Sequence, residues 1–331
     1  MDHRLGFTGD VMLGRLVDEH QRQRPVTAVW GNLLDRLRGL DGLFVNLECC
    51  LSTRGEPWRR TYRAFHFRAD PAWAVPALQQ AGVDCGALAN NHVLDFEEAA
   101  LRDTLSHLDD GDIAHAGAGR TREAAFEPAL VTVGDLAVGF VSFTDNTPEY
   151  AAEADAPGTA YVEFDVDDAE TRAAVSAALV RARDGDPDLL VASLHWGPNM
   201  VEEPPEAFRR FGRWLVDEGV DLVCGHSAHV FQGVEVYRGC PILYDAGDFV
   251  DDYAVDGRLR NDRSFFFEVS VTPDGTPTEL RLVPTEIYDF SVHAADPGAA
   301  AWSRERMQRL SAPFGTAFER HGEQLVCDLA G

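Results

Sequence analysis

The sequence predicts a mixed α/β sandwich built on two sheets, and two observations lead to this fold class. From Arg4 to Cys224, apolar strand-like runs alternate with stretches of helical period, which is the pattern of βαβ units. Beyond Val230, consecutive strand-like runs follow one another, with Asp274-Gly275 as a hairpin turn. Parallel strands followed by antiparallel ones favour two mixed sheets over a single doubly wound sheet.

Each element follows from its local pattern. Short apolar runs bounded by turn residues predict strands at 4–8, 43–47, 84–89, 113–116, 136–144, 189–194, 221–224, 232–237, 242–244, 264–272 and 278–284. Amphipathic stretches predict helices at 27–37, 71–81, 96–108, 166–183 and 205–218. The helix at 71–81 has the clearest start, with Asp70 before it and Pro71 in its first turn. Residues 58–67 form an aromatic, Arg-rich loop. We expect one main domain, 1–295, and a C-terminal helical tail, 296–331, packed on the same domain.

The charge of the chain is strongly negative. There are 29 basic residues against 55 acidic ones, so the net charge is −26 and the pI is near 4.6. All basic residues are arginine, and lysine is absent from the sequence. Excess carboxylate without lysine is typical of a halophilic protein, whose repulsion is screened by salt. An acidic protein from a GC-rich genome is the alternative. Either origin disfavours binding to nucleic acid or to an anionic membrane.

Cysteine usage and the N-terminal residues bear on the compartment. The six cysteines contain no C-x-x-C pair, and several lie in apolar runs, where a free thiol acts as a small hydrophobe. The chain leads from Met1 directly into a strand, with no signal-like segment and no apolar run of membrane-spanning length. We therefore expect a cytoplasmic protein without a membrane span in this chain.

Polar side chains follow five predicted strands. They are Asp10, then Asn46 with Glu48, then Asn90, Asn91, His92 and Asp95, then His195, then His226 and His229. Burying such groups costs several kcal/mol unless they are hydrogen-bonded or bound to a metal. Strand ends are also where α/β enzymes place their chemistry. Taken together, the clusters predict one metal site assembled from distant parts of the chain.

Each cluster also has a structural interpretation. Asp10 would cap a helix beginning near Val11, His92 would be a hydrogen-bonded core histidine, and His195 would pack on Trp196. The mixture of carboxylate, amide and imidazole suits Mn²⁺, Fe²⁺ or Zn²⁺, whereas Ca²⁺ takes oxygen ligands only. More than four ligands indicate one or two ions, and a two-ion centre suits hydrolysis of phosphate esters.

Seven motifs in order resemble the capsule synthesis protein CapA family, which is linked to poly-γ-glutamate production. They are Gly9-Asp10-Val-Met-Leu-Gly14-Arg15, Asn46-Leu47-Glu48, Leu88-Ala-Asn-Asn91-His92-x-x-Asp95, Gly117-Ala-Gly119, His195-Trp196-Gly197, Gly225-His226-x-x-His229-Val230 and Tyr244-x-x-Gly247-Asp248-Phe249. The family is similar to the calcineurin-like metallophosphoesterases. The resemblance implies a four-layer α/β/β/α sandwich of the metallo-dependent phosphatase type, with mixed sheets and a metal centre between them.

The resemblance also implies a role for each motif residue. Asn91, His195 and His226 would hold one ion. Asp10 and His229 would lean toward the other, with Glu48 in the bridging position. His92 would protonate the leaving group, and Asp95 would orient it.

The sequence departs from the pattern of these relatives at several positions. Where phosphoesterases have Asp-x-His, this chain has Met12, so one metal position lacks a ligand and a single-ion site is an alternative. The stretch after Gly197 reads Pro198-Asn199-Met200, and Asp248 replaces the usual Asn of Gly-Asn-Phe. Many relatives also carry an N-terminal membrane anchor, which we do not find here.

The expected substrate is an anionic small molecule or polymer. Arg15, Arg59, Arg60, Arg63 and Arg68 form a basic concentration in an acidic chain. We predict substrate contacts from Arg15, Arg59 and Arg63, and from Trp196; arginines paired with neighbouring acids are the alternative. The resemblance leaves two functions open. One is a metal-dependent hydrolase acting on a phosphoester or a γ-glutamyl polymer. The other is a non-catalytic, metal-binding accessory protein with capsule-synthesis partners.

Overall fold

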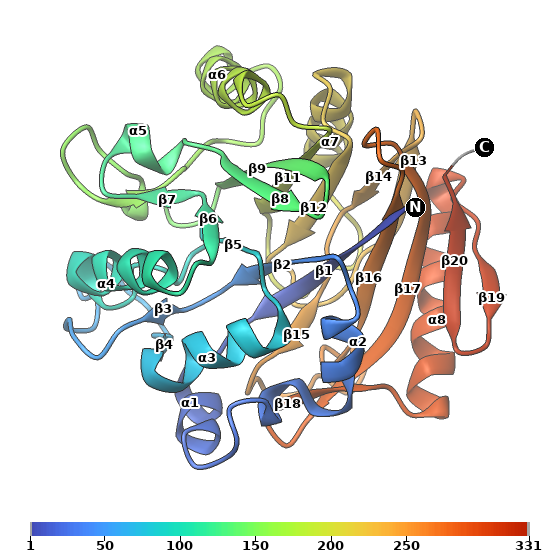
Figure 1. Ribbon diagram of the computed structural model, residues 1–331, viewed down its shortest axis with the longest axis horizontal. Coiled ribbons are helices and arrows are strands. Elements are labelled where there is room, and N and C mark those ends of the chain that lie inside the picture. The colour runs from blue at the N-terminus through green and yellow to red at the C-terminus, as the bar shows by residue number, and fades with distance from the viewer. Residues whose placement is uncertain (1, 330–331) are drawn as a thin grey trace.

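The computed structural model describes residues 2–329 and shows a mixed α/β sandwich with two main sheets (Figure 1). The larger sheet contains β1 (His3–Val11), β2 (Gly42–Leu47), β5 (Cys85–Ala87), β6 (Ala114–Ala116), β15 (Asp248–Val250), β16 (Arg263–Val271), β17 (Pro277–Tyr288), β18 (Ser291–Ala294), β19 (Glu319–His321) and β20 (Gln324–Asp328). The smaller sheet contains β8 (Ala129–Val133), β9 (Leu136–Thr144), β11 (Leu189–His195), β12 (Leu222–His226), β13 (Val234–Tyr237) and β14 (Cys240–Leu243).

The remaining elements are short strands and helices. Two strand pairs stand apart from the main sheets: β3 (Cys50–Leu51) with β4 (Arg68–Ala69), and β7 (Ala118–Gly119) with β10 (Gly158–Thr159). The α-helices are α1 (Arg15–Gln21), α2 (Leu34–Arg38), α3 (Pro71–Ala81), α4 (Glu97–Asp110), α5 (Arg122–Ala125), α6 (Ala169–Asp184), α7 (Glu206–Asp217) and α8 (Pro297–Ser311). Three 3-10 helices lie at Ala28–Leu33, Pro148–Tyr150 and Ala312–Phe314.

Both main sheets are mixed, as predicted. In the larger sheet β1, β2, β5 and β6 pair in parallel, while β16, β17 and β20 continue it antiparallel beside β1. In the smaller sheet β9, β11, β12 and β14 are parallel, and the edge strands β8 and β13 are antiparallel. The parallel strands of each sheet therefore end at a common edge, where loops can bring their side chains together.

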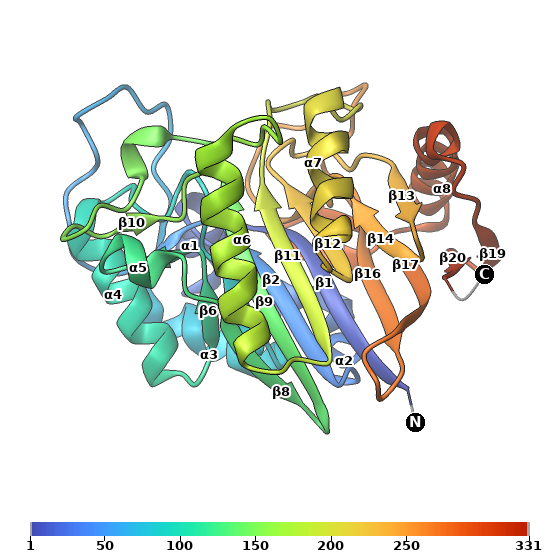
Figure 2. The same cartoon turned by 90° about the horizontal axis from the view of Figure 1, so that it is seen from above.

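Three apolar clusters hold the elements together. One joins the larger sheet to α3 and α4, a second lies between the two sheets, and a third joins the smaller sheet to α6 and α7. Figure 2 shows α6 and α7 side by side over β11 and β12. Helix α8 adds Met307 and Leu310 to the cluster between the sheets. The α/β sandwich is confirmed, while the strict four-layer description stays a prediction.

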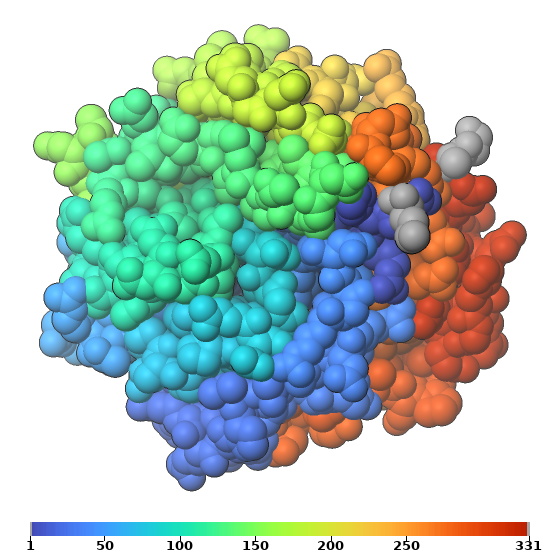
Figure 3. All heavy atoms as spheres, in the orientation of Figure 1, coloured from blue at the N-terminus to red at the C-terminus, as the bar shows by residue number. Residues whose placement is uncertain are grey.

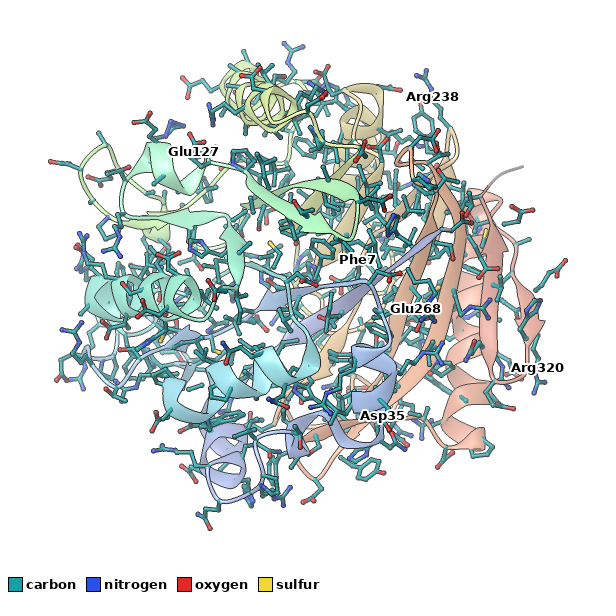
Figure 4. All side chains as sticks on the ribbon, viewed as in Figure 1. Phe7, Asp35, Glu127, Arg238, Glu268 and Arg320 are labelled. Atoms are coloured by element: carbon teal, nitrogen blue, oxygen red, sulfur yellow. The ribbon has the colours of Figure 1, made fainter. Side chains whose placement is uncertain are left out.

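Local sequence explains the well-defined elements. Asp70 accepts a hydrogen bond from Ala72 N at 2.9 Å and so caps α3, which has Pro71 in its first turn and ends at Gly82 in the left-handed region. In β16, Phe265 and Phe267 enter the cluster between the sheets, whereas Phe266 enters the cluster beneath the helices. Successive side chains thus point to opposite faces, as expected of a strand that is buried on both faces. Figure 4 shows Phe7 at the centre of the molecule, and Glu127 and Arg320 at its margin.

Two of the sequence expectations need correction. The helix predicted at 27–37 is a 3-10 helix and a short α2, because the backbone turns at Gly31, whose φ is 47°. The expectation of a helical tail holds for α8 but is wrong for residues 319–328, which form β19 and β20. Leu325 and Cys327 lie in the cluster between the sheets and favour a strand there. Figure 3 shows this C-terminal segment, in red, along one flank of the molecule. The division into a main domain and a tail stays a prediction.

Candidate metal centre

The ends of four strands bring five of the six predicted metal ligands together. Strand β1 pairs in parallel with β2, which sets Asp10 opposite Asn46, and Glu48 follows directly after β2. In the smaller sheet β11 and β12 end at the same level, with His195 opposite His226. Asp10 lies within β1, and helix α1 begins only at Arg15, so the alternative of a helix cap at Asp10 is wrong.

Close backbone packing aligns these strand ends. A Cβ on Gly9 would lie 2.0 Å from Gly247 O, and one on Gly225 would lie 2.0 Å from Tyr244 O. Only glycine permits this approach, which lets Asp10 N donate to Gly247 O at 2.9 Å. The glycines before Asp10 and His226 therefore allow both ligands to reach the same place.

Asp10 stands at the centre of the cluster and presents each carboxylate oxygen to a different histidine. Its Oδ1 lies 3.4 Å from Nδ1 of His226, and its Oδ2 lies 3.3 Å from Nδ1 of His229. Asn46 Nδ2 donates to the Oδ1 of Asp10 at 2.6 Å. Asp10 and Glu48 are 0% exposed, whereas His92 and His229 are each 8% exposed. The site therefore meets solvent on the side of the two latter rings.

Glu48 lies on the other side of the cluster. Its Oε1 is 3.8 Å from Nε2 of His195 and 3.9 Å from Nε2 of His92. Ligand atoms of Asp10, Glu48 and His229 all lie within 4.8 Å of one another, so these three buried side chains can hold a metal ion. Tyr253 directs its hydroxyl toward Glu48 Oε2 at 3.4 Å.

Several polar atoms of this cluster lack a hydrogen-bond partner among residues 2–329, although they are buried. They are Asp10 Oδ2, Glu48 Oε1, Asn91 Oδ1, His195 Nε2, His226 Nδ1, Asp248 Oδ2 and Asp251 Oδ2. An unsatisfied buried polar group costs about 1–3 kcal/mol, and more when it is charged. Carboxylate, amide and imidazole atoms left free in one place fit a divalent metal ion such as Mn²⁺, Fe²⁺ or Zn²⁺.

The protonation of the site follows from burial and charge. Burial and the neighbouring Asp10 hold the pKa of Glu48 well above its usual range. Burial lowers the pKa of His195 to about 3, so its imidazole is neutral at physiological pH. Burial alone would raise the pKa of Asp10, yet the contacts with His226 and His229 bring it well below its usual range. A neutral imidazole beside an ionised carboxylate is the state in which both groups bind a metal.

His92 and Asp95 form a pair beside the cluster. Nδ1 of His92 lies 2.6 Å from Oδ2 of Asp95, and Phe67 packs its ring on the imidazole with centroids 3.7 Å apart. Asp95 also accepts hydrogen bonds from Phe67 N at 2.7 Å and from the Tyr150 hydroxyl at 3.0 Å. Burial lowers the pKa of His92, and Asp95 partly offsets this effect. The ring therefore presents Nε2 toward Glu48.

Asn91 lies between β5 and α4, next to His92 in the chain. Its side-chain oxygen is buried, and its backbone oxygen accepts a hydrogen bond from Nη2 of Arg63 at 2.6 Å. The preceding Asn90 is buried and is bonded to Leu47 O through its Nδ2 at 2.9 Å. Asn90 thus has a structural role, and the ligand role of Asn91 stays a prediction.

Of the predicted substrate contacts, Arg15 and Arg63 lie against neighbours of the His92–Asp95 pair, whereas Trp196 is buried in the core. Arg15 places its guanidinium 4.7 Å from the centroid of Phe65 and its Nε 3.3 Å from Asp252. Arg63 contacts Thr147 at 2.7 Å and Tyr150 at 3.3 Å, and Arg59 is exposed on the loop at 58–67.

The substrate contact predicted for Trp196 is not supported. Its side chain is 2% exposed, stacks on Phe208 at 4.7 Å and donates to Tyr244 O at 2.8 Å. It is a packing residue of the cluster under α6 and α7.

Two residues of the cluster were not predicted as site residues. Asp248 accepts a hydrogen bond from His229 at 2.9 Å, and Tyr253 lies against both His229 and Glu48. The available signal was the change from Asn to Asp in the Gly247-Asp248-Phe249 motif, followed two residues later by Asp251 and Asp252. The strand β15 that carries Asp248 was not predicted.

Comparison with known proteins matches residues 4–253 to a family described as bacterial capsule synthesis protein PGA_cap. The chain belongs to this family. A protein of Mycobacterium tuberculosis, named probable polyglutamine synthesis accessory protein, is 34% identical over 298 residues, which cover 86% of this chain and 77% of that protein.

Two further relatives carry the name CapA. The capsule biosynthesis protein CapA of Bacillus anthracis is 27% identical and covers 92% of this chain and 71% of its own length. The PGA biosynthesis protein CapA of Bacillus subtilis is 25% identical and covers 86% of this chain and 71% of its own length. Within residues 2–329, none of the helices is both long and apolar enough to cross a membrane.

Proposed function

We propose that this protein is a metal-dependent hydrolase of poly-γ-glutamate or cell-surface polymer biosynthesis. The observation that carries the proposal is the His92–Asp95 pair beside the buried ligand cluster. Asp95 accepts the Nδ1 proton, and Nε2 of His92 faces the same Glu48 oxygen as Nε2 of His195. His92 is outside the proposed ligand set. A site that served only to bind metal would not need this histidine or the carboxylate of Asp95 behind it.

Asp10, Glu48, His195, His226 and His229 would hold the metal, with Asn91 at the margin. A bound divalent ion supplies Lewis acidity and lowers the pKa of a bound water. His92 would then bind the leaving group through Nε2 and donate a proton to it. Asp95 would stabilise the imidazolium that forms before this transfer, because its carboxylate is fixed by Phe67 N and by Tyr150.

The substrate would be anionic, either a phosphoester or a γ-glutamyl polymer. Arg15, Arg59 and Arg63 would contact it, in a chain whose net charge is −26. A group of arginines on so acidic a molecule attracts phosphate or carboxylate and leaves other surfaces repulsive to it. We also propose a cytoplasmic location. The six cysteines of the protein are free thiols, which suit a reducing compartment.

A second function is favoured by one observation. Met12 is buried and accepts a hydrogen bond from Gly14 N through its sulfur at 3.1 Å, so it adds no ligand to the cluster. A centre with fewer ligands would suit a metal-binding accessory protein that acts through capsule-synthesis partners. The name of the mycobacterial relative, an accessory protein, fits this alternative.

One experiment separates the two functions. The metal content of the purified protein is measured, and the metal-replete protein is then assayed on phosphomonoesters, phosphodiesters and γ-glutamyl polymer. Hydrolysis of any of them, lost on chelation and restored by metal, supports the enzyme. If the replete protein hydrolyses none of them yet binds the polymer, the accessory function replaces the proposal.

A further inference from the structure

We infer that Asp248 is a metal ligand of this chain and that it completes the second position of a two-ion centre. The inference rests on the metal centre proposed above. It concerns how many ions that centre holds and which residue binds the second ion. It assigns a role to a residue at which this chain departs from the related motif, in which Asn is usual.

The carboxylate of Asp10 defines two separate positions. Its Oδ1 approaches His226 and its Oδ2 approaches His229, so the two histidines lie at opposite oxygens of one group. A carboxylate with a histidine at each of its oxygens would provide ligands for two ions, which is the number used by two-metal hydrolases. A single ion would leave one of the two oxygen–histidine pairs without a partner.

Strand pairing aligns Asp248 with the second position. β15 runs parallel to β1, and Asp248 is the Cα partner of Asp10 in that pairing. Neighbours in register on adjacent strands project to the same face of a sheet. The backbone here is set by Asp245, which accepts hydrogen bonds from Ala228 N at 2.7 Å and from Gly247 N at 2.8 Å.

The atoms around His229 have the spacing of ligands on one ion. Nδ1 of His229 lies 2.9 Å from Asp248 Oδ1 and 3.3 Å from Asp10 Oδ2. Ligand atoms bonded at about 2.1 Å, at octahedral to tetrahedral angles, are roughly 3.0–3.4 Å apart. The Nδ1 atom of an imidazole carries at most one proton, so it cannot make a full hydrogen bond to both carboxylates, and Asp10 Oδ2 finds no other hydrogen-bond partner in the described chain.

The second oxygen of Asp248 is also free for an ion. Asp248 is 1% exposed, and within residues 2–329 no N–H or hydroxyl group donates to its Oδ2, although the carboxyl group of Asp251 lies beside it. Asp10, Glu48 and Asp248 are three buried carboxylates that lie around His229. Carboxylates this close repel one another when they are ionised, and bound cations would relieve that repulsion. A fourth carboxylate, Asp251, lies three residues further along the same segment.

The alternative role for Asp248 is to orient His229 by accepting the proton of Nδ1, as carboxylates behind metal-binding histidines do. The variant Asp248→Asn separates the two roles. Its amide oxygen still accepts that hydrogen bond, but the variant removes the negative charge that a second ion requires. Asp84→Asn is the matched control, because Asp84 is a half-buried carboxylate that accepts a hydrogen bond from Leu43 N before β5, away from the ligand cluster.

The test is the number of Mn²⁺ ions per chain, measured by elemental analysis after equilibrium dialysis and by calorimetric titration. We expect two ions in the wild type and in Asp84→Asn. In Asp248→Asn we expect one ion, with affinity for the second weakened at least 100-fold. Circular dichroism confirms that each variant is folded. Two retained ions in folded Asp248→Asn would overturn the ligand role and leave the metal centre intact.

The wild type alone provides a second measurement. Two Mn²⁺ ions bridged by one carboxylate give an exchange-coupled signal in electron paramagnetic resonance, whereas a single ion gives an uncoupled one. A coupled signal supports the inference, and an uncoupled signal from saturated protein overturns it even if Asp248→Asn does not fold. Absence of any bound metal would overturn the proposed metal centre itself, which is a different outcome from finding one ion.

Discussion

Asp95 holds the His92 ring from behind, with 2.6 Å between Oδ2 of the carboxylate and Nδ1 of the imidazole. Both side chains are buried, and the carboxylate is itself fixed by two further hydrogen bonds. The ring therefore has one orientation, in which Nε2 faces the ligand cluster. This relationship makes His92 the residue whose replacement best separates catalysis from metal binding.

His92→Ala should reduce turnover of any hydrolysed substrate by about 10²–10⁴-fold, which is the usual contribution of a general acid or base. The metal content should stay that of the wild type, because His92 is outside the proposed ligand set. His115→Ala is the control. His115 lies on β6, away from the cluster, and pairs with Asp109 of α4. Wild-type turnover in His92→Ala would remove the proton-transfer role.

His226→Ala should lose metal and turnover together. In the wild type, a chelator should lower the thermal midpoint, since an ion bound only to the folded state at 100 times its dissociation constant adds about 2.7 kcal/mol. In His226→Ala the effect of chelator should be smaller, because at least one ion is already absent. Calorimetry with and without chelator measures both. If chelator lowers the thermal midpoint equally in the wild type and in His226→Ala, the ligand role of His226 is contradicted.

Arg59→Gln should raise KM for an anionic substrate and leave kcat unchanged. Arg59 is exposed on the loop beside the site, and an exposed charge interaction is worth about 0.2–1 kcal/mol, or roughly a 1.5- to 5-fold change. Arg60→Gln is the matched control, because Arg60 is held by Glu97 at 2.6 Å and so is already paired. Steady-state kinetics at low salt measures both. Equal effects of the two variants would indicate general electrostatics instead of a contact by Arg59.

Dilution of salt should destabilise the fold. Repulsion among the charges that make up the net −26 is screened at high ionic strength, where the Debye length is about 3 Å at 1 M, and acts over about 30 Å at 0.01 M. The thermal midpoint should therefore fall steadily from molar to tens of millimolar KCl. A midpoint that is constant or rises on dilution would refute the halophilic interpretation of the composition.

Asp145→Asn should stabilise the protein at pH 8 and have little effect at pH 4. Burial raises the pKa of Asp145 to about 6 from 3.8, although a hydrogen bond from Gly197 N lowers it in part. The folded state thus holds this proton more tightly than the unfolded state, so stability falls as the pH rises from 3.8 to about 6, by at most about 3 kcal/mol in all. Below pH 3.8 the carboxyl is protonated in both states and the cost disappears.

Urea unfolding at the two pH values measures this difference. Asp155→Asn is the control and should change little at either pH, because Asp155 is exposed in the loop before β10. The same gain from Asp145→Asn at pH 4 and at pH 8 would show that ionisation of Asp145 is not its cause.

Sequence patterns predicted the elements whose local signals are strong. The helix at 71–81 and the strand at 136–144 have the predicted bounds, because a capped, amphipathic segment and a long apolar run each specify their own structure. Strands β15, β19 and β20 escaped prediction. They are short and owe their conformation to pairing with β1 and β17, which are distant in the sequence.

For the site, the sequence by itself determined that Asp10, Glu48, His195, His226 and His229 stand at the ends of strands, because each follows an apolar run that local patterns reveal. Only the tertiary structure decided which polar residues join them. Asp248 reaches His229 through the register of β15 against β1, while Trp196 turns into the core although it adjoins His195. Periodicity describes the direction of a side chain relative to its own strand. Burial and contact depend on which other strand lies beside it, and only the folded chain sets that relationship.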